Sequence, residues 1–275
     1  MKAKNLIGIM QGRLLTPINN RIQAFPVERW HEEFLIAKEL GLDCIEFIFE
    51  GEDFRKHPLM RKEGIDTIKK TETETGVRVL SVCADYFMDF PLHKGDQIGK
   101  NISVLKELIS NSSLLGVRDI IIPCVDHSRI SNPEEMTQFE SSLNRCIPLA
   151  EKYSINITLE ADLPPEDFLS LLNRFKSHCI KVNYDMGNSA FLGYNPGKEI
   201  DAYGRWITDV HIKDRVYKGG TVPLGNGNVD FQVVFNKLRE MNFSGIYIFQ
   251  SARKETGREK ETIKEYMKFI EQYLN

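Results

Sequence analysis

The chain lacks the features that mark several large classes of protein. It has five cysteines in 275 residues, an odd number without the paired spacing of a zinc site. Four of them, Cys44, Cys83, Cys124 and Cys179, lie inside apolar runs, where cysteine acts as a small hydrophobic residue. The apolar runs all fall short of the ~20 residues of a membrane span, and the N-terminal one is too short for a secretory signal. We therefore expect reduced thiols in a cytoplasmic protein.

Neither sign of charge is in large excess. The net charge is −3 and the isoelectric point is about 6.1, which argues against the basic face that nucleic-acid binding usually needs. Hydrophobic residues make up 41% and charged residues 27% of the chain, as is usual for a globular protein with a large core. Linker-like and low-complexity stretches are also missing from the sequence. We expect one domain over residues 1–275, with no nucleic-acid or membrane partner.

Short apolar runs alternate with amphipathic segments along the whole chain. Strands are predicted at Leu6–Met10, Asp43–Phe49, Val77–Ala84, Arg118–Cys124, Ile155–Glu160 and Ser244–Gln250, and in two runs that end at Asp185 and His211. Helices are predicted at Val27–Leu40, Met60–Thr75, Ile98–Leu115, Pro133–Tyr153 and Phe231–Met241, after Pro165, between the sixth and seventh strands, and from Glu255 onward. Eight such units of about 34 residues predict an α/β fold, the (β/α)8 TIM barrel. The alternative, a doubly wound sheet, lacks its glycine-rich motif after the first strand.

Metal-competent residues stand at the ends of successive predicted strands. The fifth strand ends at Glu160, the sixth at Asp185 and the seventh at His211. The carboxyl ends of barrel strands share one rim, so these side chains should converge there. Carboxylate and imidazole ligands suit one divalent ion, Mn²⁺, Mg²⁺, Co²⁺ or Zn²⁺. The eighth strand ends in Gln250, whose carbonyl can ligate a metal but cannot accept a proton as a carboxylate does. The competing interpretation is that each strand merely ends in a polar residue.

Cationic side chains follow several of the same strands. Arg13 follows the first strand, Lys213 and Arg215 follow the seventh, and Arg253 follows the eighth. Such groups bind phosphate or carboxylate, which indicates an anionic substrate, although surface loops are also rich in lysine and arginine. Glu46, within the second strand, is a further candidate for substrate contact.

A glycine-rich loop lies between the seventh strand and the following helix. It contains Gly219-Gly220 and the run from Leu224 to Gly227. Three interpretations are open: a mobile lid, a nest of backbone amides for phosphate, and a plain long loop.

Five motifs resemble the xylose-isomerase-like barrels over essentially the full length. The resemblance is to their sugar-phosphate isomerase/epimerase branch, which includes the L-ribulose-5-phosphate 3-epimerases (hexulose-phosphate epimerases). The motifs are I-E-F at 45–47, L-E at 159–160, Y-D-M-G-N at 184–188, V-H-I-K-D at 210–214 and V-P-L-G-N-G-N-V-D-F at 222–231. The resemblance implies a sugar or sugar-phosphate substrate and one divalent ion held by Glu160, Asp185, His211 and a fourth residue. Asn188, which closes the third motif, is expected to contact the substrate.

The sequence departs from this family at the fourth ligand, because Gln250 stands where the family has a second glutamate. The resemblance implies a proton transfer through an enediolate, with one glutamate on each face of the substrate carbon, and it leaves Glu160 as the retained base. Either another group (Glu46, Asp162 or Lys213) replaces the second glutamate, or the reaction needs one base, as an isomerisation, a dehydration or another β-elimination does.

Three function classes follow from the sequence. The first is a metal-dependent isomerase or epimerase of a ketose-type sugar or sugar phosphate. The alternative is a metal- and sugar-binding relative without epimerase activity. A metal-dependent nuclease is a distant third, because such sites gather more ligands than three strands offer here. Whether the chain forms a homo-oligomer is left open.

Overall fold

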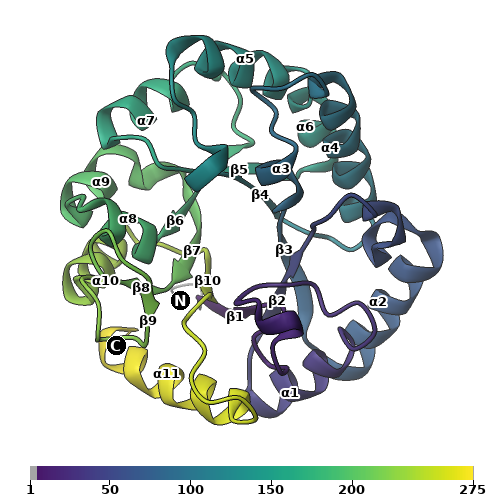
Figure 1. Cartoon of the computed structure of the whole chain (residues 1–275), viewed down its shortest axis with the longest axis vertical. Helices are drawn as coiled ribbons and strands as arrows, with labels where there is room; N and C mark the ends of the chain where they lie inside the picture. The colour runs from purple at the N-terminus through teal and green to yellow at the C-terminus, as the bar shows by residue number, and fades with distance from the viewer. Residues whose placement is uncertain (1–4, 275) are drawn as a thin grey trace.

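Eight parallel strands close into a barrel in the computed structural model, which describes residues 5–274 (Figure 1). The strands are β1 (Leu6–Met10), β2 (Cys44–Ile48), β3 (Arg78–Cys83), β4 (Asp119–Cys124), β5 (Asn156–Ala161), β6 (Ile180–Asp185), β7 (Ile207–Ile212) and β10 (Ile246–Phe249). The ring closes where β1 pairs with β10 on one side, Leu6 opposite Ile246, and with β2 on the other, Gly8 opposite Cys44. The predicted TIM barrel is confirmed.

The helices surround the barrel and bury one apolar face each (Figure 1). The main ones are α1 (Glu32–Leu40), α2 (Lys62–Thr75), α4 (Ile98–Ser113), α5 (Pro133–Asn144), α6 (Ile147–Tyr153), α7 (Pro165–Leu172), α9 (Pro196–Tyr203), α10 (Phe231–Glu240) and α11 (Glu259–Leu274). Shorter ones are α3 (Tyr86–Asp89), α8 (Met186–Leu192), η1 (Ile18–Asn20), η2 (Phe54–Lys56), η3 (Pro58–Met60), η4 (Asp126–Ser128) and η5 (Gly204–Trp206). In α10 the buried residues are Phe231, Val234, Phe235 and Leu238, the spacing of a helix that covers a barrel. Within the described residues, none of the helices has the length and apolarity to cross a bilayer.

Two predicted helices differ from the structure. The helix expected over Pro133–Tyr153 is two helices, because Pro148 occupies the first turn of α6 and has no N–H to continue the hydrogen bonds of α5. The helix expected from Val27 begins only at Glu32, after a stretch of turns.

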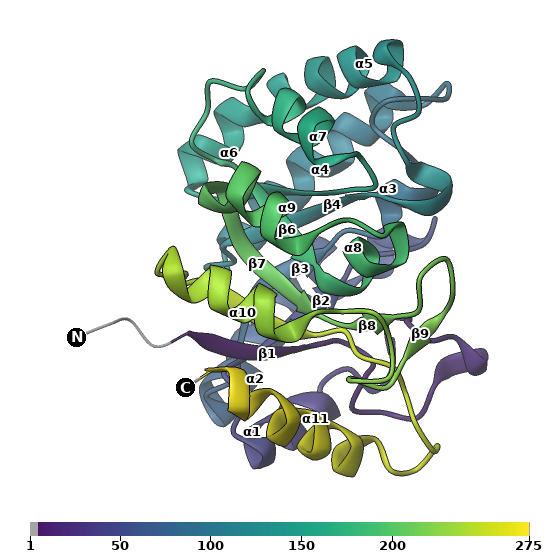
Figure 2. The ribbon, with the colours of Figure 1, turned by 90° about the vertical axis from the view of Figure 1, so that its left-hand side faces the viewer.

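The glycine-rich loop forms a small antiparallel hairpin beyond the carboxyl ends of the barrel strands (Figure 2). Its strands are β8 (Asp214–Arg215) and β9 (Thr221–Val222). The buried carboxylate of Asp214 accepts hydrogen bonds from the backbone N–H groups of Gly225 and Gly227, both at 2.9 Å, and of Val229 at 3.2 Å. A Cβ atom on Gly227 would lie 2.1 Å from Asp214 Oδ1, so the close approach requires glycine. The amide nest considered for phosphate is therefore filled by the protein's own carboxylate.

The barrel interior is polar as well as apolar. The buried carboxylate of Asp119 on β4 accepts hydrogen bonds from Asn156 Nδ2 at 2.9 Å, Thr158 Oγ1 at 3.0 Å and Thr208 Oγ1 at 2.7 Å. The alternation of the strands turns these side chains inward and the apolar ones outward toward the helices. Polar groups thus continue down the barrel axis from the rim.

Candidate metal centre and active site

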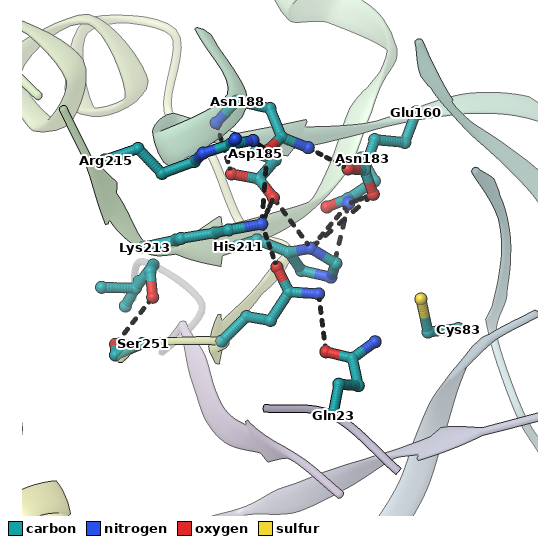
Figure 3. A network of polar contacts seen from close by, with 12 residues as sticks. Gln23, Cys83, Glu160, Asn183, Asp185, Asn188, His211, Lys213, Arg215 and Ser251 are labelled. Carbon is teal, nitrogen blue, oxygen red and sulfur yellow. Dashed lines mark hydrogen bonds and ion pairs between the residues drawn. The ribbon is translucent and has the colours of Figure 1, made fainter. Parts of the chain in front are cut away.

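Glu160, Asp185 and His211 converge at the carboxyl-end rim of the barrel. They come from the neighbouring strands β5, β6 and β7, and their side chains point toward one another (Figure 3). One ligand atom from each lies within 4.8 Å of the other two. His211 Nδ1 is 3.8 Å from Glu160 Oε2 and 3.7 Å from Asp185 Oδ2. The three residues that the sequence singled out are therefore brought to one point.

Two asparagines hold Glu160 in place. Asn183 Nδ2 lies 2.8 Å from Glu160 Oε2, and Asn188 Nδ2 lies 2.7 Å from Glu160 Oε1. Asn183 stands two residues before Asp185, so strand alternation directs both side chains to the same face. The sequence analysis did not single out Asn183, although this spacing was available as a signal.

The donor set fits a divalent cation. Metal–ligand bonds of about 2.0–2.6 Å allow atoms this close together to reach a common ion. The carbonyl oxygen of Asn183 is buried without a hydrogen-bond partner, so a further electron-rich atom also faces this region. Two carboxylates and one imidazole leave positions open for substrate oxygens. Glu160, Asp185 and His211 would hold the ion.

A second group of donors lies deeper in the barrel and shares His211. It consists of Glu46, Asp209 and His211, again within 4.8 Å of one another, and all three are fully buried. Glu46 Oε1 is 2.8 Å from His211 Nε2, and Ser81 Oγ donates to Glu46 Oε2 at 2.5 Å. A carboxylate on one ring nitrogen of a histidine fixes the orientation of the ring. The other nitrogen, Nδ1, lies 3.0 Å from Asn183 Nδ2 and faces Glu160 and Asp185. Glu46 thus acts on His211, and its predicted contact with substrate stays a prediction.

The electrostatics of the two carboxylates at the rim differ. Burial, together with the nearby charge of Asp185, raises the pKa of Glu160 to about 7. Burial acts on Asp185 in the same direction, but Lys213 and His211 outweigh it and hold the pKa of Asp185 below its ordinary value. Of the two carboxylates, Glu160 therefore holds a proton more readily, while Asp185 stays ionised.

Lys213, between β7 and β8, and Arg215, on β8, face this centre. Lys213 Nζ lies 2.9 Å from Asp185 Oδ2, 2.9 Å from Gln250 Oε1 and 3.3 Å from Asn188 Oδ1. Arg215 donates to the same Asn188 oxygen at 2.8 Å. Three of the predicted substrate-binding residues therefore lie beside the candidate metal ligands: Asn188, Lys213 and Arg215. Their contact with substrate stays a prediction.

An amide bridge crosses the mouth from Gln250. Gln250 Nε2 donates to Gln23 Oε1 at 3.1 Å, and Gln23 Nε2 donates to Asp85 Oδ2 at 2.7 Å. Burial raises the pKa of Asp85, which lies just after β3. The loop that follows β1 therefore places Gln23 between the ends of β10 and β3. A glutamine in a loop has no sequence signature, which is why the sequence analysis missed it.

Arg13 and Arg253 bind backbone carbonyls of the same loop. Arg13 donates to the carbonyl of Ile22 and to Gln23 Oε1, the latter at 3.2 Å. Arg253 donates to the carbonyls of Gly12, Leu15 and Ile22. Both guanidinium groups thus hold the loop in place, and a role in substrate binding stays a prediction for both.

The start of this loop is fixed by a fully buried carboxylate on α1. Glu33 accepts hydrogen bonds from the backbone N–H groups of Gly12 at 2.9 Å and Leu14 at 3.2 Å. Burial raises the pKa of Glu33 to about 7 in spite of these bonds. The loop is therefore anchored by an acid whose charge is costly to bury.

Comparison with known proteins agrees with the fold. Residues 34–273 match the family model described as "Xylose isomerase-like TIM barrel". The chain is 27% identical over 247 residues to L-ribulose-5-phosphate 3-epimerase UlaE of Salmonella typhi, covering 85% of this chain and 86% of that protein. The corresponding protein of Escherichia coli O1:K1 is also 27% identical over 247 residues, covering 85% of this chain and 86% of that protein.

Solved structures share the fold. D-allulose 3-epimerase from Methylomonas sp. in complex with D-allulose superimposes with a TM-score of 0.77 at 17% identity, covering 98% of both chains. The IOLI protein with a binding zinc atom superimposes with a TM-score of 0.76 at 18% identity, again covering 98% of both. Since the family model spans most of the sequence, the chain belongs to the xylose isomerase-like TIM-barrel family.

Proposed function

We propose that the protein is a divalent-metal-dependent isomerase or epimerase of a ketose-type sugar or sugar phosphate, acting through an enediolate. The observation that carries this proposal is the convergence of Glu160, Asp185 and His211 on one point at the rim. The similarity to UlaE, named as an L-ribulose-5-phosphate 3-epimerase, supports a small ketose as the substrate class. A bound divalent ion would polarise the substrate carbonyl and so acidify the neighbouring C–H bond.

Glu160 is the proton acceptor in this proposal. Asn183 and Asn188 fix one oxygen each, so the carboxylate is held in one orientation. A bound divalent ion would favour the ionised form of Glu160, which is the form that accepts a proton. Asp185, whose pKa is low, serves as a ligand throughout.

A one-base reaction is the second candidate, and the environment of Gln250 favours it. Where a second proton carrier would stand, the amide of Gln250 is bonded to Lys213 on one side and to Gln23 on the other. An amide cannot return a proton to the opposite face of the substrate carbon. An aldose–ketose isomerisation or a β-elimination needs no such group.

The test is a solvent-deuterium experiment with the metal-loaded protein. Protein loaded separately with Mn²⁺, Mg²⁺, Co²⁺ and Zn²⁺ is incubated in D₂O with a panel of ketoses and ketose phosphates, and with metal-stripped protein as the control. The proposal expects deuterium at the carbon next to the carbonyl, only with metal present, for at least one sugar. Equal exchange by the stripped protein would contradict metal dependence, and a lack of exchange across the panel would contradict the ketose assignment.

A further inference from the structure

Lys213 is surrounded by oxygen acceptors of the metal centre. Its ammonium group has three N–H donors and lies within hydrogen-bond distance of three oxygens, on Asp185, Gln250 and Asn188. The side chain is only 15% exposed. The ammonium group of Lys213 therefore occupies a cation site made by protein oxygens. One of these oxygens belongs to Asp185, which is also a candidate metal ligand.

The orientation of Gln250 follows from this contact. Lysine can only donate, so the oxygen of the Gln250 amide must face Lys213, and its NH₂ group then donates to Gln23. Both ends of the amide are engaged, and Gln250 is 7% exposed. Its carbonyl could reach a metal ion only by giving up the bond to Lys213.

The charges around Lys213 also argue against Gln250 as a metal ligand. A glutamate at position 250 would give Lys213 a second carboxylate partner. With glutamine there, the carboxylate that pairs with the ammonium is Asp185, which is also a candidate metal ligand. The ion is then attracted by Glu160 and Asp185 and repelled by an ammonium that contacts Asp185 directly. Charges a few ångströms apart in a partly buried site interact strongly, so this repulsion should weaken metal binding.

We propose that the ammonium group of Lys213 occupies the side of the metal centre where a fourth protein ligand would lie. By binding the carbonyl of Gln250, Lys213 prevents that carbonyl from becoming a metal ligand. The inference rests on the proposed metal-dependent function. The bound ion then has three protein ligands, Glu160, Asp185 and His211, and keeps its other positions open for substrate oxygens.

The test measures Mn²⁺ affinity without turnover. Metal-stripped wild type, Lys213→Met, Lys213→Arg and Gln250→Ala are titrated with Mn²⁺ by calorimetry and by the electron paramagnetic resonance signal of free Mn²⁺. Lys237→Met is the matched control, because it removes a lysine that pairs with Asp201 on the helical surface. Thermal unfolding by circular dichroism checks that each variant is folded.

Removal of the positive charge of Lys213 should increase the affinity for Mn²⁺. Lys213→Met is expected to bind Mn²⁺ at least about tenfold more tightly than wild type, and Lys213→Arg to stay within about threefold. Gln250→Ala should also stay within about threefold, because the amide is not a ligand, and Lys237→Met should match wild type. Should Lys213→Met fail to fold, Gln250→Ala decides the ligand question by itself.

Two different results overturn the inference, and they are distinguishable. If wild type binds Mn²⁺ but Lys213→Met binds no more tightly, or Gln250→Ala binds more than about tenfold more weakly, Lys213 does not exclude Gln250, and the proposed function still stands. If neither wild type nor any variant binds Mn²⁺, Mg²⁺, Co²⁺ or Zn²⁺ at millimolar concentration, the metal-dependent function fails and this inference fails with it.

Discussion

The two sides of the barrel mouth are built from different chemistry. On the side of β5, β6 and β7, two carboxylates and an imidazole meet within 4.8 Å. On the side of β10 and β1 lie the amides of Gln250, directly after β10, and of Gln23, in the loop after β1, and the nearby guanidinium groups bind loop carbonyls. One side can hold a metal and move a proton, whereas the other can donate and accept hydrogen bonds.

This difference between the two sides limits the proton transfers that the proposed reaction can use. A symmetric exchange of protons between the two faces of a carbon needs a proton carrier on each side, and the amides of β10 and β1 supply none. Glu33, Arg13 and Arg253 hold the loop after β1 where Gln23 bridges the mouth. Under the proposed function, we expect the second side to position the substrate while the first performs the chemistry.

The largest expected effect is on the carboxylate side. Replacing Glu160 with glutamine should lower the rate of deuterium exchange about 10²–10⁴-fold, because the general base is lost. The measurement is exchange in D₂O at saturating metal, with metal content checked for each variant. Glu166→Gln is the matched control, because this carboxylate is exposed in the first turn of α7, and it should change the rate by less than about threefold. If Glu160→Gln kept full exchange with metal still bound, the assignment of the base would be wrong.

The next effect concerns the free energy of unfolding and its dependence on Glu33, which anchors the loop after β1. The folded-state pKa of Glu33 is about 7, above its ordinary value, so the folded protein binds a proton that the unfolded chain releases. Stability is therefore lost as the pH rises from about 4.5 to 7 and is level above that range. At ~1.4 kcal/mol per pKa unit, the loss between pH 5 and 8 is about 2 kcal/mol.

Glu33→Gln should remove this loss, since the amide oxygen still accepts a backbone hydrogen bond without a buried charge. Urea unfolding of wild type and variant at pH 5, 6, 7 and 8 measures it. The variant should gain about 2 kcal/mol relative to wild type between pH 5 and 8. Parallel pH profiles for the two proteins would show that Glu33 does not titrate in this range.

A smaller effect should come from the residue behind His211. Glu46→Gln weakens the acceptor for His211 Nε2, so metal affinity should fall about tenfold, the lower end of the range for such partners. Ser81→Ala, which removes only the hydroxyl on the other oxygen of Glu46, should have a lesser effect. The ¹⁵N shifts of the His211 ring provide a readout independent of affinity. An unchanged tautomer and unchanged affinity in Glu46→Gln would mean that Glu46 does not orient the histidine.

The parts predictable from sequence were those with a strong local pattern. Apolar runs that close on Glu160, Asp185 and His211 revealed both the strands and the rim, because parallel strands must end at the same face. Pro148 was a visible signal for the break between α5 and α6, but the prediction of a single helix over Pro133–Tyr153 did not use it. The two-residue strands β8 and β9 carry too few residues to show any period.

Other features depend on tertiary contacts that a sequence does not encode locally. Glu33 lies on an amphipathic helix, where a glutamate is normally exposed, yet it is completely buried against the loop after β1. The direction of the long side chains of Arg13 and Arg253 is set by the carbonyls that they find. Gln23 reaches the site only because these contacts fold its loop over the mouth.

The stereochemistry of proton exchange tests the central claim most directly. The metal-loaded wild type is incubated in D₂O with a sugar that it exchanges, and deuterium is followed by NMR in the recovered substrate and in the epimer at the exchanging carbon. With a proton carrier on one side of the mouth only, deuterium should enter the recovered sugar with its configuration retained, much faster than the epimer forms. Formation of the labelled epimer as fast as exchange would contradict the placement of proton carriers on one side only, and it would require a second proton carrier facing Glu160.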